Sequence, residues 1–190
     1  MREHSPLDPP PLETDRLILR GHKLQDFAPC AAMWADPEVV KQIGLGKPSS
    51  EAQTWGRILN YVGHWRLMGF GFWAVEEKSS GQFIGELGFA DFKRELSPSI
   101  QGLPELGWAL ATCAHGKGYA SEALRAVVEW GDRFFEGPRT VCIIHPENLA
   151  SLRVAEKMGY QLVQTTHYAG SPVILFSRTR NSKLPKLGEK

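Results

Sequence analysis

The sequence contains little cysteine, no long apolar run and almost no net charge. Its three cysteines among 190 residues are far apart and lack metal-ligand spacing, which argues against a disulfide framework or a zinc site. The formal net charge is +1, which argues against a broad nucleic-acid or membrane footprint. We therefore expect a small ligand or a local protein contact, and no metal.

Targeting signals are also missing from the sequence. No apolar run approaches the ~20 residues of a membrane-spanning helix, and the N-terminus has prolines and charges where a secretory signal has an apolar core. We expect a cytoplasmic protein. The length favours one domain, here residues 12–180, with a flexible proline-rich arm at 1–11 and a flexible basic tail at 181–190.

Apolar periodicity along the domain alternates between strand and helix patterns. Ser50 and Gln53 have the spacing of a capping box, which predicts a helix start. The expected strands are 16–20, 70–77, 82–92, 104–110, 140–144, 160–168 and 172–178, and the expected helices are 24–35, one from Ser50, 119–135 and 148–159. Because hairpins alternate with one strand-helix-strand crossover, the sheet should be mixed, with helices on both faces.

A glycine turn, Gly116-Lys117-Gly118, stands directly before the helix at 119–135. Such a turn presents bare backbone N–H groups to an anion at the helix start. A Walker A loop fails because Tyr119 follows where Ser or Thr is required, and a dinucleotide fingerprint lacks its third glycine and its later acidic residue. A pyrophosphate turn and a merely structural tight loop both remain open.

Four segments together resemble the GNAT family of N-acetyltransferases. They are "LETDRLILR", "FIGELGF", "ELGWALATCAHGKGYASEAL" and "HPENLASLRVAEKMGY", and within the family they are most similar to the RimJ/RimL-type branch that acetylates N-termini of ribosomal proteins. The resemblance implies an α/β (α+β) GNAT fold, with one mixed, mostly antiparallel sheet of about seven strands and helices on both faces. It also implies acetyl-CoA as cosubstrate, without a metal.

The resemblance assigns cofactor contacts to three places in the chain. The pyrophosphate would be held by backbone N–H groups of Gly116, Lys117, Gly118, Tyr119 and Ala120. The pantetheine arm would pair with backbone groups near Trp108, Ala109 and Leu110, and would also face Asn148. The family usually has Gln or Arg where this chain has His115, which leaves the backbone contacts as the expected ones.

Acetyl transfer to an amine requires a base, and Glu105 is the first candidate. Period-two alternation puts Glu105, Gly107 and Ala109 on one face of a strand, where the small residues leave room for a ligand. The resemblance agrees with this role. A plain surface glutamate is the competing interpretation, and Glu86 is the reserve candidate for the base.

The departing thiolate requires a proton, and the resemblance points to Ser151 as the donor, since the helix at 148–159 has no tyrosine. Sequence alone favours Asn148 as the cap of that helix. His145 is a secondary candidate. Cys113 and Cys142 suggest a covalent route, but neither shows a partnered base, so we expect direct transfer in a ternary complex.

The acceptor pocket should come from the early helices between Leu24 and Met68 and from the loop 95–103. The branch implies a protein N-terminus as acceptor, of which a ribosomal protein is one candidate, while related enzymes take small-molecule amines. We expect a monomer or a homodimer that binds neither nucleic acid nor membrane. A non-catalytic acyl-CoA binding module is the alternative function.

Overall fold

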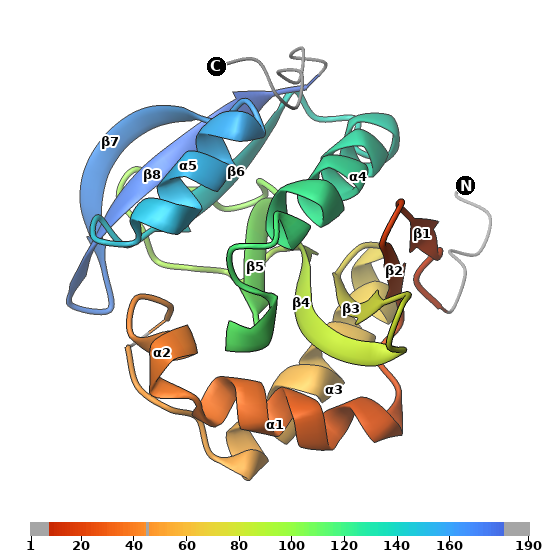
Figure 1. Ribbon diagram of the computed structural model, residues 1–190. Coiled ribbons are helices and arrows are strands. Elements are labelled where there is room, and N and C mark those ends of the chain that lie inside the picture. Colours follow the sequence, from red (N-terminus) through yellow and green to blue (C-terminus); the bar gives the residue numbers. More distant parts are fainter. Residues whose placement is uncertain (1–7, 45, 181–190) are drawn as a thin grey trace.

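One eight-stranded sheet runs through the computed structural model, which describes residues 8–44 and 46–180 (Figure 1). In spatial order its strands are β1 (Leu12–Glu13), β2 (Leu17–Arg20), β3 (Phe72–Glu77), β4 (Gln82–Ala90), β5 (Glu105–Leu110), β6 (Arg139–Ile144), β8 (Ser171–Thr179) and β7 (Gln161–Tyr168). All neighbours are antiparallel except β5 and β6. The predicted mixed sheet is confirmed, and the additional strand is the two-residue β1.

The four predicted helices are present, one of them divided, and the structure adds two short helical segments that were not predicted, α2 and η2. They are η1 (Leu24–Asp26), α1 (Phe27–Ala35), α2 (Pro37–Val40), α3 (Glu51–Met68), η2 (Thr112–Ala114), α4 (Tyr119–Phe134) and α5 (Leu149–Lys157). The single helix predicted at 24–35 is a 3-10 turn followed by α1. Pro29 lies in the first turn of α1, where its missing N–H has no intrahelical partner to lose.

The capping box at the start of α3 is confirmed. The Ser50 backbone N–H donates to Gln53 Oε1 at 2.8 Å, and the Gln53 N–H donates to Ser50 Oγ at 3.3 Å. Gly69 ends the helix in the left-handed region, at φ 73°. These local signals fix where α3 begins and ends, and therefore which of its side chains face the sheet.

Helix α4 packs its apolar stripe on one face of the sheet. Leu124 and Val127 are fully buried, in one core cluster with Leu87 and Leu106 of the central strands. A Cβ at Gly131 would lie 2.7 Å from the Phe89 ring, so a glycine allows helix and strand to approach closely. The helix predicted at 119–135 from apolar periodicity is thus confirmed, ending at Phe134.

The opposite face of β4 carries a fully buried carboxylate. Tyr61 Oη and Trp34 Nε1 each donate to Glu86 Oε1 at 2.9 Å, Cys30 Sγ donates to Oε2 at 3.3 Å, and His22 Nε2 lies 3.4 Å from Oε2. Burial alone would raise the pKa of Glu86, but its interactions with His22 and other neighbours keep it below its ordinary value. The carboxylate therefore ties α1 and α3 to the sheet.

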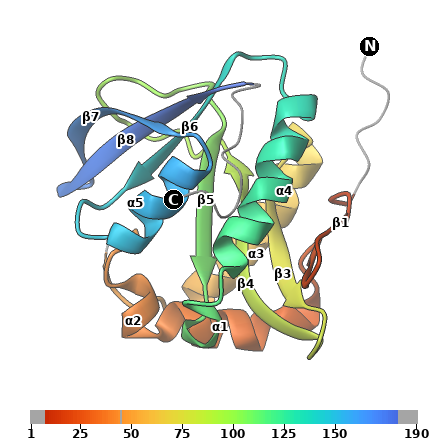
Figure 2. The same ribbon diagram turned by 45° about the horizontal axis from the view of Figure 1, so that its top comes forward.

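Strands β5 and β6 touch at one end and then diverge (Figure 2). Their single registered pair is Glu105 with Val141, and the Val141 N–H donates to Pro104 O at 3.0 Å. The α4 crossover joins these two parallel strands, as predicted. Beyond Glu105, the edge of β5 that faces β6 has no registered strand partner among the described residues, which leaves backbone groups for a ligand.

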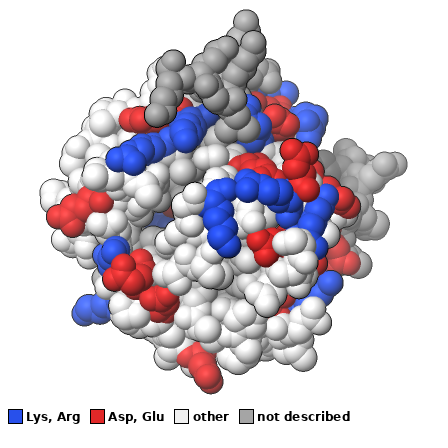
Figure 3. Space-filling view, viewed as in Figure 1, with Lys and Arg blue, Asp and Glu red and all other residues white. Residues whose placement is uncertain are grey.

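The surface and the termini add three facts. No helix in the described part of the chain is long and apolar enough to cross a membrane. Lys and Arg side chains lie among Asp and Glu side chains on the face in Figure 3. Of the arm predicted at 1–11, residues 1–7 lie outside the described residues, as does the whole tail 181–190, while Pro10 O accepts a hydrogen bond from Trp73 Nε1 at 2.9 Å.

Replacing Glu86 by glutamine should lower the free energy of unfolding at neutral pH by about 3 kcal/mol, because it breaks a buried charged network. The folded-state pKa of Glu86 is depressed, so its contribution is complete above the ordinary glutamate range and is lost as the pH falls through the folded-state value. The gap between wild type and Glu86→Gln should therefore narrow in acid. Urea denaturation across pH measures this.

The control for this experiment is Glu129→Gln, which removes an exposed carboxylate on α4. It should unfold like the wild type at every pH. Equal urea midpoints for Glu86→Gln and wild type at neutral pH would contradict the structural role given to the buried carboxylate.

Candidate functional site

A cavity of about 480 Å³ lies where β5 and β6 diverge. Its wall comes from α3, from the segment after α2, from β5, from the start of α5 and from the β7–β8 hairpin. The early helices, which we expect to form the acceptor pocket, therefore contribute to this cavity. The loop after β4 contributes Phe92 and Arg94, whereas residues 95–103 do not line the cavity. In that segment, Ile100 instead packs in a cluster with Val141 and Leu175.

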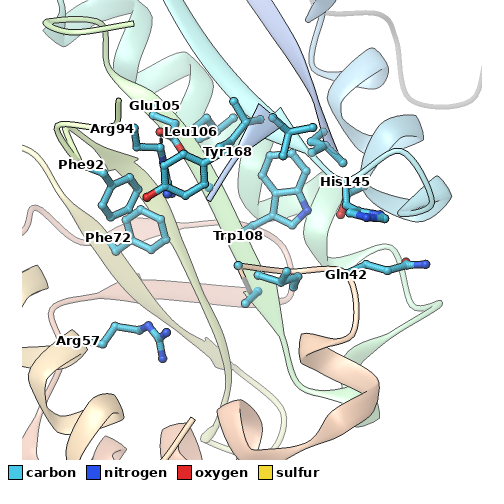
Figure 4. Close-up of a pocket in the computed structure, with 18 of the residues that line it drawn as sticks. Gln42, Arg57, Phe72, Phe92, Arg94, Glu105, Leu106, Trp108, His145 and Tyr168 are labelled. Carbon is cyan, nitrogen blue, oxygen red and sulfur yellow. Dashed lines mark hydrogen bonds and ion pairs between the residues drawn. The ribbon is translucent and has the colours of Figure 1, made fainter. Parts of the chain in front are cut away.

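Glu105 lies in the wall at the first residue of β5, and its side chain is 6% exposed. Its Oε2 accepts from Arg94 Nε at 2.7 Å, and the Arg94 guanidinium carbon lies 4.6 Å from the centroids of both the Phe92 and Tyr168 rings (Figure 4). Burial raises the pKa of Glu105, and the charge of Arg94 opposes that rise. The carboxyl group is thus a stronger base than an exposed glutamate.

Small residues follow Glu105 along the same face of β5, as the alternation predicts. Gly107 and Ala109 both line the cavity. A Cβ at Gly107 would lie 2.8 Å from the Phe72 ring, so the position accepts no larger residue without movement. Trp108 also reaches the cavity wall, while Leu110 does not line it and is 7% exposed. The strand therefore offers an open backbone beside the carboxylate.

The start of α5 brings three predicted residues to the cavity: His145, Asn148 and Ser151. Asn148 caps the helix, because its Oδ1 accepts from the Ser151 N–H at 3.0 Å. Its Nδ2 lies 3.5 Å from Gln42 O, in the segment after α2. The cap predicted from sequence is confirmed, and the same asparagine faces the cavity that contains Glu105.

The glycine turn lies between β5 and α4, away from the cavity wall. Gly116 and Gly118 have φ of 73° and 80°, which non-glycine residues rarely adopt. A Cβ at Gly116 would meet nothing within 4 Å, so this backbone faces open space. His115 Nε2 donates to Leu110 O at 2.9 Å, which ties its ring to the end of β5. The turn thus fits a backbone cradle for a pyrophosphate.

The charges around this turn are arranged by Arg16. Glu122, in the first turn of α4, would repel an anion, but Arg16 Nε donates to its Oε2 at 2.7 Å. Arg16 Nη1 also donates to Lys117 O at 3.0 Å. One arginine therefore compensates the carboxylate and holds a carbonyl of the turn, so that the N–H groups at the helix start meet no uncompensated negative charge.

Several candidates lie elsewhere. Glu86 is fully buried beneath the cavity and does not line it, although its donor Tyr61 does. The thiols of Cys30, Cys113 and Cys142 are also absent from the wall. No group of three or more His, Cys, Asp or Glu side chains within residues 8–44 and 46–180 could hold a metal ion.

The sequence did not identify four side chains of the wall as functional: Arg57, Tyr61, Arg94 and Tyr168. Arg94 comes from a loop without periodicity, and Tyr168 from the end of a hairpin strand. Their only local signal was proximity in sequence to elements already expected near the site. The contacts of Arg94 with Glu105 and with Tyr168 depend on tertiary structure.

Comparisons with known proteins agree on one family. The model of the acetyltransferase (GNAT) domain matches residues 16–161. The uncharacterized protein YkkB of Bacillus subtilis is 30% identical over 88% of this chain and 94% of its own. A putative GnaT-family acetyltransferase from Bordetella pertussis is 31% identical, with a TM-score of 0.78 over 90% of this chain and 99% of its own.

A more distant structure shares the fold. RimL, a ribosomal L7/L12 alpha-N-protein acetyltransferase in complex with coenzyme A, has a TM-score of 0.72 at 16% identity, covering 92% of this chain and all of its own. At this identity the likeness concerns the fold alone. It does not separate the RimJ/RimL-type branch from other members.

Gly118→Val should weaken coenzyme A binding at least about 10-fold, because a β-branched residue is strained at positive φ and would distort the turn. Isothermal titration with coenzyme A measures this. Gly102→Val is the matched control, with φ of 79° in the wild type and open space around it, away from the cavity. Equal affinity in the two variants would contradict the assignment of the turn.

Proposed function

Because the chain belongs to the GNAT family and is therefore an acetyl-CoA-dependent acetyltransferase, we propose that it transfers the acetyl group directly to a primary amine bound in the cavity. The observation that carries this proposal is that Glu105 and Ser151, from β5 and α5, line one cavity at the divergence of β5 from β6. Family membership favours an enzyme over the binding module that the sequence left open.

Glu105 is the proposed base. An amine is mostly protonated at neutral pH, and attack on the thioester carbonyl requires its lone pair. The carboxylate takes this proton directly or through one water. Burial supports the role because it raises the pKa of Glu105 towards the working pH, while the ion pair with Arg94 holds the side chain in position. The neutral amine then forms the new C–N bond.

Ser151 is the proposed partner of the leaving group. When the C–S bond breaks, the thiolate of coenzyme A takes up a proton, and the Ser151 hydroxyl can donate a hydrogen bond to it. The attacking nitrogen loses a second proton when the amide forms. Because a serine hydroxyl is a weak acid, that proton reaches the thiolate through water and the Ser151 hydroxyl. The Asn148 side chain supports this arrangement, since its bond to the Ser151 N–H fixes the first turn of α5.

The remaining contacts of the cofactor follow from the backbone. The N–H groups of residues 116–120 would bind the pyrophosphate, and backbone groups of Trp108 to Leu110 would pair with the pantetheine arm as an added strand. The glycine turn at positive φ supports the first contact. The edge of β5 supports the second, because no strand is registered with it beyond Glu105, and only Leu110 O at its end is taken, by His115 Nε2. The thioester would then lie towards Glu105, at the end of β5 that is still paired with β6.

Two sources of the amine fit this geometry. The name of RimL states an action on a ribosomal protein N-terminus, and a peptide end could enter the same cavity. A small amine is the other source. A panel of candidate acceptors should contain both peptides with free N-termini and small amines. Thiol release from acetyl-CoA is the measured signal. If no amine in a broad panel causes thiol release, the proposed function is contradicted.

Glu105→Gln should lower kcat by about 100-fold or more and leave coenzyme A affinity unchanged, because the variant keeps the shape of the base and loses its proton-accepting oxygen. Steady-state thiol release and titration with coenzyme A measure the two quantities. Glu129→Gln is the control for the loss of a carboxylate. Wild-type kcat in Glu105→Gln would eliminate Glu105 as the base.

Arg94→Gln should shift the acid limb of the kcat/KM profile to higher pH. Arg94 opposes the upward effect of burial on the pKa of Glu105, so its removal raises that pKa further and protonates the base over a wider pH range. Arg133→Gln removes an exposed charge on α4 and should leave the profile unchanged. An unmoved or downward-shifted limb in Arg94→Gln would show that the limb reports another group.

A further inference from the structure

Arg57 is a cation on the cavity wall whose function is not explained by the acetyl transfer itself. It extends from α3 towards the cavity, and no dashed line joins it to another residue in Figure 4. Its guanidinium carbon lies 3.7 Å from the centroid of the Trp34 ring, so the group is held by a cation–π contact. The aromatic ring fixes the position of the charge without using its N–H groups.

The donors of Arg57 lack acceptors. Within residues 8–44 and 46–180 it forms no ion pair and no hydrogen bond, and its Nη1 is buried without a partner. A buried donor without an acceptor is costly, and most such groups in proteins are satisfied. The other arginine of the cavity differs, because Arg94 is paired with Glu105 at 2.7 Å. A ligand cannot reach Nη1 itself, but Nε and Nη2, on the other edge of the guanidinium, are not buried in this way and can donate to a carboxylate in the cavity.

Glu86 is the nearest alternative explanation for the arginine. Burial raises the pKa of Glu86, and the interactions with His22 lower it most. The charge of Arg57 lowers this pKa as well, to a smaller extent than His22. However, the oxygens of Glu86 already accept from Tyr61, Trp34 and Cys30. Glu86 therefore balances part of the charge and uses none of the donors.

We propose that Arg57 binds a carboxylate of the acceptor, so that the substrate is an amine that carries a carboxylate within the span of the cavity. This inference rests on the proposed function. A guanidinium matches a carboxylate with two parallel hydrogen bonds, and the amide side chains of Gln53 and Asn60 line the same wall beside it. The same charge disfavours polycationic amines. The carboxylate belongs either to a free amino acid or to an acidic side chain near a peptide N-terminus.

Equilibrium binding to the protein saturated with coenzyme A tests this directly. The ligands are matched pairs: free amino acids against their C-terminal amides, and peptide amides that begin Ser-Glu or Ser-Ala-Glu against those with Gln in place of Glu. In at least one pair the carboxylate member should bind about 10-fold more tightly or better. The pair that shows the preference identifies which of the two sources supplies the carboxylate.

Three variants make the result specific. Arg57→Gln should reduce the preference to less than about 2-fold, since a neutral side chain no longer favours the charged ligand. Arg57→Lys should keep part of it, because the charge remains without the planar fork. Arg66→Gln, which removes an exposed charge from the same helix, should keep all of it. If the affinity of a variant for coenzyme A is unchanged, that variant is folded.

The remaining outcomes overturn the inference or the function separately. Equal binding within every pair, no binding of any ligand, or a preference that persists in Arg57→Gln would overturn the inference. Thiol release assayed on the same panel tests the function on its own. Thiol release without a binding preference for the carboxylate ligands would support the transferase function and contradict the role of Arg57. A binding preference without thiol release would support the carboxylate site and contradict acetyl transfer.

Discussion

The divergence of β5 from β6 is the constraint on which the site depends. These two parallel strands have one registered pair, Glu105 with Val141. Beyond it, part of a strand edge in the middle of the sheet has no strand partner among the described residues. Backbone polar groups require partners, and here a ligand can supply them. The α4 crossover that joins these strands also positions the glycine turn, so the anion cradle and the open edge belong to one structural unit.

Charge compensation is the second feature that organises the molecule. Glu122 near the glycine turn is paired with Arg16, Glu105 in the cavity with Arg94, and Glu86 beneath it is surrounded by hydrogen-bond donors. Each carboxylate is therefore held in a defined environment that sets its proton affinity. Against this background the unpaired donors of Arg57 stand out, which connects the electrostatics of the cavity to the identity of the acceptor.

Sequence patterns predicted most of the fold because the signals that define it are local. The capping box at Ser50, the stripe of α4 and the alternation at Glu105, Gly107 and Ala109 each depend on residues within a few positions of one another. The roles of Glu105, Ser151 and the glycine turn came from combining these patterns with the family resemblance, and they stay predictions about chemistry.

What the sequence did not predict comes from contacts between distant segments. The Arg94–Glu105 pair requires the loop after β4 to fold back over β5, and the Arg57–Trp34 stack requires α1 to pack on α3. The sequence periodicity of the loop and of the two helices does not indicate either contact. The two-residue β1 is likewise too short for a pattern, because it exists only through pairing with β2.

A crystal structure of the protein with coenzyme A would show directly whether the glycine turn and the open edge of β5 hold the cofactor. We expect pyrophosphate oxygens within hydrogen-bond distance of the N–H groups of residues 116–120, and a pantetheine arm along the open edge of β5 that ends towards Glu105. A cofactor bound on another surface, or a pyrophosphate that leaves the turn between Gly116 and Gly118 without contacts, would contradict this expectation.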